Sequence, residues 1–355
     1  MARLFTPLKI RSIELKNRIV VSPMCQYSSI DGFANDWHLV HLGSRAVGGA
    51  GLIISEATAV SPEARITPDD LGLWKDEHMD KLKQIVGFIE KQGSIPGIQL
   101  AHAGRKASHA SPWKGGNALS TDDVAAWQTV APSAVPFRND EPAPLALDKA
   151  GIAKVINDFV VAAQRALQIG FKVAEIHAAH GYLLHEFYSP LSNQRTDEYG
   201  GSFENRIRLT VEITEAVRKV WPDELPLFVR ISASDWTEGG WTIEDSVALA
   251  KVLKTKGADL VDCSSGGNVP QAKINVGPGY QVPFAEAIKK QTGILTGAVG
   301  IITAPQQAEE ILANEQADVI IMAREFLRDP YLPLHAAKAL DVDMSWPVQY
   351  DRAKR

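Results

Sequence analysis

Eight short segments of the chain are almost continuously apolar and rich in β-branched residues, and small or polar residues follow each of them. Such runs are typical of strands covered on both faces rather than strands with one solvated face. The predicted strands are residues 18–24, 51–60, 95–101, 172–177, 226–232, 260–264, 294–299 and 319–323.

The segments between these strands repeat their apolar residues at helical spacing. Residues 76–92 carry such a stripe and stop at Gly93, and residues 148–169 carry another and stop at Gly170, where glycine is a helix-end signal. Four more helices are expected to begin near Ser202, Thr242, Val282 and Ala304.

Strands that alternate strictly with helices predict a parallel sheet, either open and doubly wound or closed into a (β/α)8 TIM barrel. The spacing favours the barrel, because about 35 residues remain for each of eight units once the termini and one long loop are set aside. Residues 1–355 are therefore expected to form a single barrel domain.

The long loop covers residues 105–147, after the third predicted strand, and its many prolines and glycines exclude one regular element. Loops of this length in compact domains are usually lids or binding loops. Barrel enzymes hold their sites at the carboxyl ends of the strands, so we expect this loop to cover an active site.

Composition narrows the function classes. The chain has 355 residues, 45% hydrophobic and 22% charged, with a net charge of −5, which argues against a nucleic-acid-binding surface. The two cysteines, Cys25 and Cys263, are too few for a disulfide framework or a zinc cage. No apolar run reaches the ~20 residues of a membrane helix, and the amino terminus is a poor signal peptide, so a cytoplasmic protein is expected.

Polar residues follow the predicted strands closely, which indicates a pocket at their carboxyl ends. The loops after strands 7 and 8, the usual phosphate site of this fold, carry Gly297, Gly300 and Arg324. Glycine lets backbone N–H groups approach an anion and arginine adds charge-assisted hydrogen bonds, although these glycines could simply turn the chain. Neither a GxGxxG fingerprint after a strand nor a GxxxxGK[ST] loop is present.

The sharpest local feature is His177-Ala-Ala-His180-Gly-Tyr182. His177 is expected to close the fourth strand, with His180 and Tyr182 in the loop beyond it, where two imidazoles could bind a carbonyl oxygen and a phenol could deliver a proton. Two other interpretations stay open. The histidines could be ordinary hydrogen-bonded core or rim residues, or part of a metal-dependent hydrolase, although HExxH is absent.

At these motifs the chain resembles the old yellow enzyme family of FMN-dependent ene-reductases, and most closely its thermophilic-like class, which includes xenobiotic reductases. The similar stretches run from residue 15 to residue 352, and so cover essentially the whole chain. They are residues 15–27, 99–106, 175–182, 189–193, 195–202, 230–234 and 347–352.

The resemblance implies a barrel that binds FMN non-covalently at its mouth. Arg230 would place positive charge beside N1 and O2 of the flavin, and Cys25 would lie near N5 and O4. The other implied ring contacts are Ser22, Pro23, Met24, Ala57 and Gln99. The ribityl phosphate would be held by Ser264, Ser265, Gly266, Gly300, Ala323 and Arg324. Ala323 replaces a glycine usual in the family, which puts the backbone approach to the phosphate in doubt at that position.

For the substrate, the resemblance implies that His177 and His180 bind the carbonyl oxygen of an α,β-unsaturated ketone or aldehyde, which Tyr27 also contacts. Hydride would pass from flavin N5 to the β-carbon, and Tyr182 would protonate the α-carbon. NADPH or NADH would reduce the FMN in a ping-pong cycle, and nitro compounds or nitrate esters could share the pocket. A non-catalytic flavin-binding protein stays open as an alternative.

In this class an arginine of a carboxyl-terminal Pro-Val-Gln-Tyr-x-Arg motif reaches the site of a neighbouring subunit. Arg352 matches it, so the tail of residues 341–355 implies a homodimer or homotetramer. A solvated tail is the alternative. The loop of residues 105–147 is longer than in the shortest relatives, which leaves the substrate range open.

Overall fold

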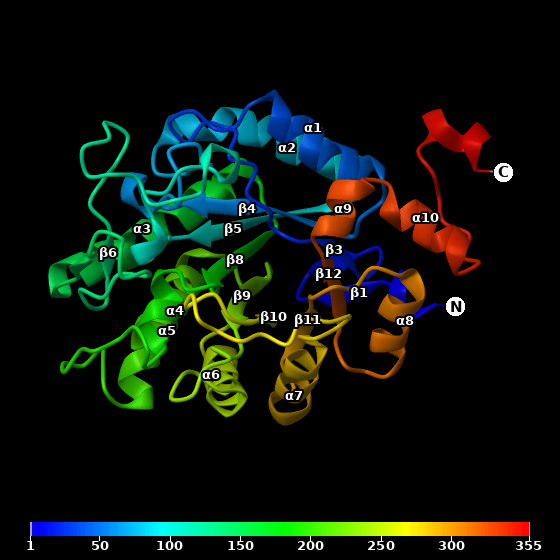
Figure 1. The fold of residues 1–355 in the computed structure, drawn as a ribbon. Coiled ribbons are helices and arrows are strands. Elements are labelled where there is room, and N and C mark those ends of the chain that lie inside the picture. Colours follow the sequence, from blue (N-terminus) through cyan, green and yellow to red (C-terminus); the bar gives the residue numbers. More distant parts are fainter. Residues whose placement is uncertain (1, 355) are drawn as a thin grey trace.

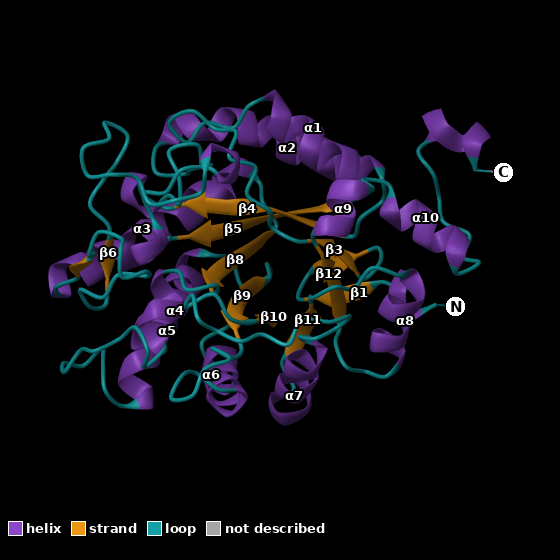
Figure 2. Cartoon of the chain, viewed as in Figure 1, coloured by secondary structure: helices purple, strands orange, loops and turns teal. Residues whose placement is uncertain are grey.

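A closed barrel of eight parallel strands forms the centre of the molecule, as the computed structural model of the chain, which describes residues 2–354, shows (Figures 1 and 2). The predicted (β/α)8 barrel is confirmed. Around the barrel the strands follow in sequence order: β3 (Ile19–Val21), β4 (Leu52–Ala59), β5 (Ile95–Ala101), β8 (Val173–Ala178), β9 (Leu227–Ser232), β10 (Leu260–Ser264), β11 (Leu295–Ala298) and β12 (Val319–Met322).

The predicted strands all occur, with small differences at their ends. The largest concerns residues 18–24, where β3 stops at Val21. Ser22 N–H still donates to Met322 O, but Pro23 has no N–H with which to continue the ladder. Residues 22–24 therefore lie beyond the strand, at the barrel mouth.

Six helices that the apolar periodicity predicts are present: α2 (Met79–Lys91), α3 (Lys149–Ile169), α5 (Phe203–Val220), α6 (Ile243–Thr255), α7 (Val282–Thr292) and α8 (Pro305–Ala313). Their ends follow the expected signals: Asp148 caps α3 by accepting from Gly151 N–H, and Gly170 ends it with φ +107°. Four helices were not predicted, namely α1 (Asp36–Val47), α4 (Leu183–Tyr188), α9 (Arg324–Arg328) and α10 (Leu332–Ala339). Helix α1 buries His38, His41 and Arg45, so its inner face does not look apolar in sequence.

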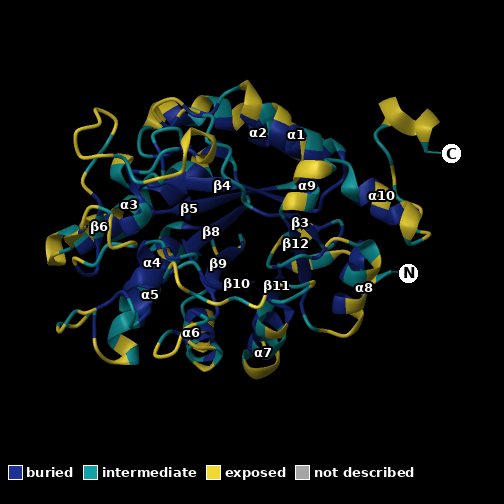
Figure 3. Ribbon diagram, in the orientation of Figure 1, coloured by how far each residue is buried: buried dark blue, intermediate teal, exposed yellow. Residues whose placement is uncertain are grey.

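Two layers of apolar side chains hold the barrel. The larger layer lies between the strands and the surrounding helices, and the smaller one fills the barrel interior at the amino ends of the strands. Figure 3 shows that the strands are buried, whereas exposed residues lie on the outer helices and loops. A hairpin of β1 (Leu8–Ile10) and β2 (Ile13–Leu15), which sequence reasoning did not predict, adds Ile10 and Leu15 to the interior cluster. The hairpin therefore closes the amino end of the barrel.

The interior changes character along the strands. Because alternate residues of a strand face the same side, the apolar residues Val173, Phe228 and Leu260 are followed two positions later by Glu175, Arg230 and Asp262. Two positions further along lie His177, Ser232 and Ser264. Three strands thus carry an apolar level, a charged level and a polar mouth.

Residues 105–147 follow β5 as an irregular loop with short regular pieces, η5 (Pro112–Lys114), β6 (Val130–Ala131) and β7 (Leu145–Ala146). The carboxyl-terminal segment η6 (Val348–Ala353) is exposed and lies on the opposite side of Figure 1 from β6. No helix of the described residues is long and apolar enough to cross a membrane.

Candidate active site

Three aromatic rings gather where β8 ends. His177 is the penultimate residue of β8, and His180 follows the strand in a left-handed conformation, φ +60°. The ring centroids of His177 and His180 are 5.1 Å apart, those of His177 and Tyr182 are 4.9 Å apart, and those of His180 and Tyr182 are 6.4 Å apart. The structure therefore brings together the two imidazoles and the phenol singled out in the sequence.

Burial controls the protonation of this cluster. It lowers the pKa of His177 and of His180 well below the usual histidine value, and the nearby Arg230 guanidinium lowers both further. Burial also raises the pKa of Tyr182 well above that of a free phenol. At neutral pH the site thus holds two neutral imidazoles and one protonated phenol.

Hydrogen bonds define the direction of each imidazole. His177 Nδ1 accepts from Ala179 N–H at 3.2 Å, so the proton of the neutral ring resides on Nε2. His180 Nε2 lies 2.6 Å from Ser264 Oγ, at the carboxyl end of β10. Ser264, predicted as a cofactor contact, is therefore also a direct neighbour of a predicted substrate-binding histidine.

The buried pair His185 and Asp235 orients the loop that follows β8 and carries His180. His185 Nδ1 accepts from Gly181 N–H at 2.9 Å, and its Nε2 faces Asp235 Oδ1 at 2.8 Å. Sequence reasoning missed both residues. A histidine within the apolar helix α4 was the available signal for His185, whereas Asp235 lies in a loop after β9 and gives no comparable signal.

The loop also packs closely on its neighbour after β10. Gly181 has φ +73°, and a Cβ atom there would come within 2.1 Å of Gly267 O. Lys106 Nζ donates to His180 O at 2.8 Å and to Gly267 O at 3.1 Å, which ties the two loops together. Glycine at 181 therefore permits a close backbone approach that no other residue allows.

The segment after β3 is held by Glu56. The β4–β5 ladder has a bulge between Ser55 and Ala57, and the extra residue, Glu56, accepts from Gln26 N–H and pairs with His38 Nε2 at 3.2 Å. This contact fixes the loop that carries Cys25 and Tyr27. The predicted contact Ala57 is buried beside the bulge, while Pro23 and Met24 are half-buried.

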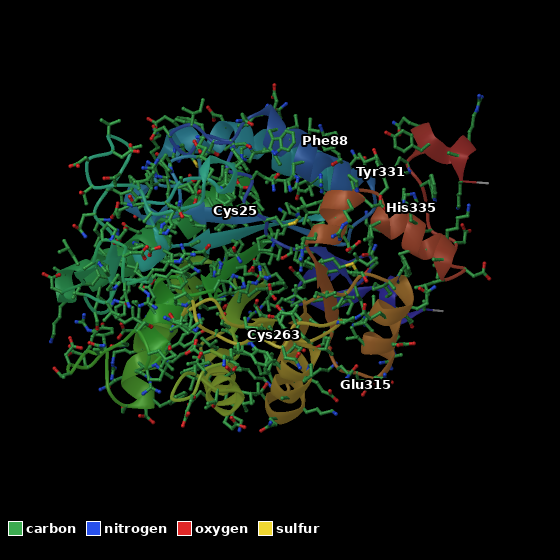
Figure 4. The ribbon with its side chains drawn as sticks, in the orientation of Figure 1. Cys25, Phe88, Cys263, Glu315, Tyr331 and His335 are labelled. Atoms are coloured by element: carbon green, nitrogen blue, oxygen red, sulfur yellow. The ribbon has the colours of Figure 1, made fainter. Side chains whose placement is uncertain are left out.

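Cys25 lies in this loop, and Figure 4 shows it well apart from Cys263. Burial raises the pKa of the Cys25 thiol, and the nearby carboxyl groups of Asp70 and Glu56 raise it further. Cys25 is therefore a neutral thiol rather than a reactive thiolate. Burial likewise raises the pKa of the Tyr27 hydroxyl.

Below the mouth, the charged level of the barrel contains two groups of contacts, one around Glu175 and one around Arg230. Gln99 Nε2 donates to Glu175 Oε1 at 2.8 Å, and Arg230 Nε lies 3.0 Å from Asp262 Oδ2. Arg230 Nη1 reaches Ser22 Oγ at 3.4 Å. The predicted residues Ser22, Gln99 and Arg230 thus meet inside the barrel. Glu175 and Asp262 were not predicted, although an acidic residue within an apolar strand was a usable signal.

A cavity of about 280 Å³ opens at the ends of β10, β11 and β12. It reaches from Arg230 inside the barrel to Arg324 on the exposed rim, and its lining includes the predicted Ser264, Gly300 and Ala323. Gly300 has φ +126°, a conformation that favours glycine, whereas Ala323 has φ −108°. Ala323 thus lies outside the left-handed region, so no positive φ requires a glycine at this position.

Two lining residues of the cavity, Tyr280 and Gln281, were missed. Gln281 Oε1 accepts from Ser265 Oγ at 2.6 Å, and its Nε2 donates to Val299 O at 3.0 Å, so one amide joins the ends of β10 and β11. Neighbouring Gly266 is buried and donates from its N–H to Ser234 O.

Other cavities lie away from this chemistry. One of them, about 690 Å³, is lined by residues before β3, β4 and β5 and by residues 342–349, at the amino end of the barrel, and contains none of the predicted site residues. Across residues 2–354, no three His, Cys, Asp or Glu side chains gather as metal ligands do. Arg352 lies exposed on η6, so its predicted contact with a neighbouring subunit remains a prediction.

Comparison with known proteins finds a matching family and relatives of similar length. The sequence model of a family described as NADH:flavin oxidoreductase / NADH oxidase matches residues 3–343. NADPH dehydrogenases of Geobacillus thermodenitrificans (strain NG80-2) and Bacillus subtilis (strain 168) are each 51% identical; the alignments cover 99% of this chain and 98% and 99%, respectively, of those proteins.

Solved structures show the same architecture. Morphinone reductase superposes with a TM-score of 0.78 at 29% identity, over 97% of this chain and 91% of that chain. A complex of 2-naphthoyl-CoA reductase with 2-naphthoyl-CoA superposes with a TM-score of 0.86 at 28% identity, over 95% of this chain and 52% of that chain.

Proposed function

The chain belongs to the NADH:flavin oxidoreductase / NADH oxidase family and is an FMN-dependent oxidoreductase of the old yellow enzyme type; on this premise we propose that it oxidises NADPH and reduces the C=C bond of α,β-unsaturated carbonyl compounds. The relatives named NADPH dehydrogenase support the choice of reductant. The observation that carries the choice of acceptor is the gathering of His177, His180 and Tyr182 at the mouth.

The residues present fit FMN. Arg324 at the cavity rim offers a cation to a phosphate, with the glycine backbone of Gly300 beside it. Inside the barrel, Arg230 Nε is buried without a well-formed hydrogen bond and Nη1 has only the long contact to Ser22, so the guanidinium can take a further polar partner. We assign the phosphate and ribityl chain to Ser264, Ser265, Gly266, Gly300, Ala323 and Arg324, and the ring to Ser22, Pro23, Met24, Cys25, Ala57, Gln99 and Arg230.

FMN, when bound, supplies the hydride-transfer chemistry at its N5 atom. The chain's own residues bind and polarise the acceptor. His177 Nε2–H donates to the carbonyl oxygen, since its Nδ1 is already occupied by Ala179 N–H. His180, whose Nε2 faces Ser264 Oγ, is the second proposed partner of that oxygen, and Tyr27 is the third. Neutral donors placed in advance stabilise the negative charge that develops on that oxygen.

Tyr182 supplies the proton. Its raised pKa keeps the hydroxyl protonated at neutral pH, as a general acid requires. In the loop of residues 105–147, the Trp113 ring packs edge-on against Tyr27, with centroids 5.8 Å apart, and the Phe137 ring lies 4.6 Å from Lys106 Nζ. We propose that this loop covers the mouth and excludes water from the reacting carbonyl.

The single mouth supports a ping-pong order in which NADPH leaves before the acceptor binds. Nitro compounds and nitrate esters are further candidate acceptors, because both present oxygen atoms to the same two imidazoles. We further propose a homodimer or homotetramer in which Arg352 reaches the neighbouring mouth; its exposure on η6 supports this arrangement.

The test is direct. The purified protein should be yellow, lose its flavin absorbance with NADPH under anaerobic conditions, and regain it when 2-cyclohexen-1-one is added. A colourless protein that FMN cannot reconstitute would contradict cofactor and function together. A yellow protein that NADPH bleaches but no enone restores would contradict the acceptor alone.

A further inference from the structure

Arg230 stands between two carboxyl groups that the proposed reaction does not use. Its strand, β9, pairs with β8 on one side and β10 on the other, and these strands contribute Glu175 and Asp262, neither of which has exposed surface. Arg230 Nε is 3.0 Å from Asp262 Oδ2, while Glu175 Oε1 accepts from the Gln99 amide at 2.8 Å. Glu175 Oε2 and both carboxylate oxygens of Asp262 are buried without a hydrogen-bond partner, so Asp262 and Arg230 form an ion pair rather than a well-aligned hydrogen bond.

Among residues 2–354, no second cation forms an ion pair with Glu175 or Asp262. The level beneath them is apolar, formed on these strands by Val173, Phe228 and Leu260, and the interior cluster continues across the barrel with Val20, Ile54 and Ile321. The neighbouring strand β5 contributes the neutral Gln99, and Ser22 follows β3. On the mouth side the titratable neighbours are the neutral His177 and His180 and the phenols Tyr182 and Tyr280, with Lys106 and His185 further out.

The net charge of Glu175, Asp262 and Arg230 indicates that one of the two carboxyl groups keeps its proton. Two ionised carboxylates beside one guanidinium would leave a net charge of −1 among buried groups, which is unfavourable because an uncompensated buried charge loses its hydration. Burial raises the pKa of both acids, and Arg230 partly offsets this for each. Asp262 contacts the guanidinium, whereas Glu175 contacts only an amide, so the proton resides on Glu175.

We propose that Glu175, Asp262 and Arg230 act as a proton-linked charge compensator, in which Glu175 binds one proton from solvent when negative charge is added on the cavity side of Arg230. The inference rests on the proposed function, because that added charge is the one the cofactor gains on two-electron reduction. Added negative charge reduces the electrostatic stabilisation that Arg230 gives to an ionised Glu175. The Glu175 carboxylate therefore becomes a stronger base. No electrons pass through the three residues; only a proton enters or leaves.

The linkage predicts an additional proton uptake confined to a pH window. Where Glu175 is already protonated it takes up nothing, and where it is partly ionised it binds a further fraction of a proton. Proton uptake per two electrons, followed with a pH indicator during anaerobic photoreduction of the holoenzyme between about pH 6 and pH 10, should exceed its neutral-pH value on the alkaline side.

Three variants separate this account from a general effect of buried acids. Glu175→Gln should abolish the alkaline excess. Glu186→Gln, a matched change at a buried carboxyl group beside Arg105, should leave the excess unchanged. Asp262→Asn should shift the excess to lower pH, because Glu175 becomes the only counterion of Arg230. A pH-independent uptake in the unaltered protein, or an excess that survives Glu175→Gln, would overturn the proposal.

A second measurement does not depend on FMN. The infrared carbonyl band of a protonated carboxylic acid should be present at about pH 7, and part of it should be absent in Glu175→Gln. If the unaltered protein lacks the component of this band that we assign to Glu175, the proposal that Glu175 is protonated is contradicted. If the protein shows it yet binds no FMN, the proposed function fails while the protonated pair stands.

Discussion

His185 Nε2 donates to Asp235 Oδ1 at 2.8 Å, and neither side chain has exposed surface. The second oxygen of Asp235 accepts from Ser189 Oγ and from Trp241 N–H, and His185 Nδ1 accepts from Gly181 N–H. This chain of bonds allows only one tautomer of His185. It therefore orients the backbone between His180 and Tyr182 from behind.

Asp235→Asn should disturb that orientation without touching the mouth. An asparagine must point its amide group at a donor, either His185 Nε2–H or Trp241 N–H, because each carboxylate oxygen faces at least one. We expect enone kcat/KM to fall by about 10- to 100-fold, since small misplacements of catalytic groups have effects of this size. FMN content should be retained. Asp80→Asn, an exposed matched change, should leave both unchanged.

Tyr182→Phe removes the proposed proton donor. Enone reduction should slow by about 10²- to 10⁴-fold, the usual contribution of a general acid, whereas reduction of the flavin by NADPH should continue at its normal rate. Stopped-flow measurement of the two half-reactions separates these effects. Equal slowing of both, or of neither, would exclude Tyr182 as the acid.

Gly181→Ala should destabilise the protein strongly because the new Cβ would lie 2.1 Å from Gly267 O. Gly201 provides the control, since its φ of +80° is similar but no atom lies within 4 Å of a Cβ there. Gly201→Ala should lower the free energy of unfolding by about 1 kcal/mol, and Gly181→Ala by ~3 kcal/mol or more. Urea denaturation measures both, and equal losses would contradict the close approach.

Glu186 should make stability fall as pH rises. Burial raises its pKa to about 8, so between the ordinary glutamate pKa and that value the folded state binds more protons than the unfolded state. The free energy of unfolding therefore decreases across this range, and Asp70, raised to about 7, acts in the same direction. His102, lowered to about 4, acts oppositely, but only below about pH 6.5.

The clearest window is thus from about pH 6.5 to pH 8. Glu186→Gln should flatten the loss of unfolding free energy over that window, by up to ~2 kcal/mol of the difference between its ends. Urea midpoints of the two proteins at several pH values provide the measurement. A variant with the same slope as the parent protein would show that Glu186 ionises normally.

Arg324→Ala should weaken FMN binding by about 10- to 100-fold, the loss expected for a hydrogen bond to a charged group. Flavin fluorescence titration of the FMN-free protein gives the dissociation constant. Arg138→Ala, in the exposed part of the loop of residues 105–147, is the control and should bind FMN normally. Riboflavin, which lacks the phosphate, should distinguish the two proteins much less.

The barrel could be predicted from sequence because its strands are buried on both faces and their apolar runs are continuous. The helix α1 and the β1–β2 hairpin could not. Helix α1 turns His38 and Arg45 inward, and each hairpin strand is three residues long, too short to show a period. The local spacing of His177, His180 and Tyr182 was sufficient to predict their meeting.

The residues that support the site were harder to find, since each acts across a long sequence separation. Glu56 reaches Gln26 only because of a bulge in β4, and Asp235 reaches His185 from a different loop. Neither contact follows from propensity or periodicity. Glu175 was visible as an acid within an apolar strand, but its partner Asp262 required the strand order.

The β1–β2 hairpin has a consequence for traffic through the enzyme. With Ile10 and Leu15 packed into it, the amino end of the barrel is closed. In the cycle that we propose, reductant, acceptor and product would therefore all enter and leave at the carboxyl end. Their binding would then be mutually exclusive. A ligand that dissociates slowly from this end would inhibit both the reductive and the oxidative half-reaction.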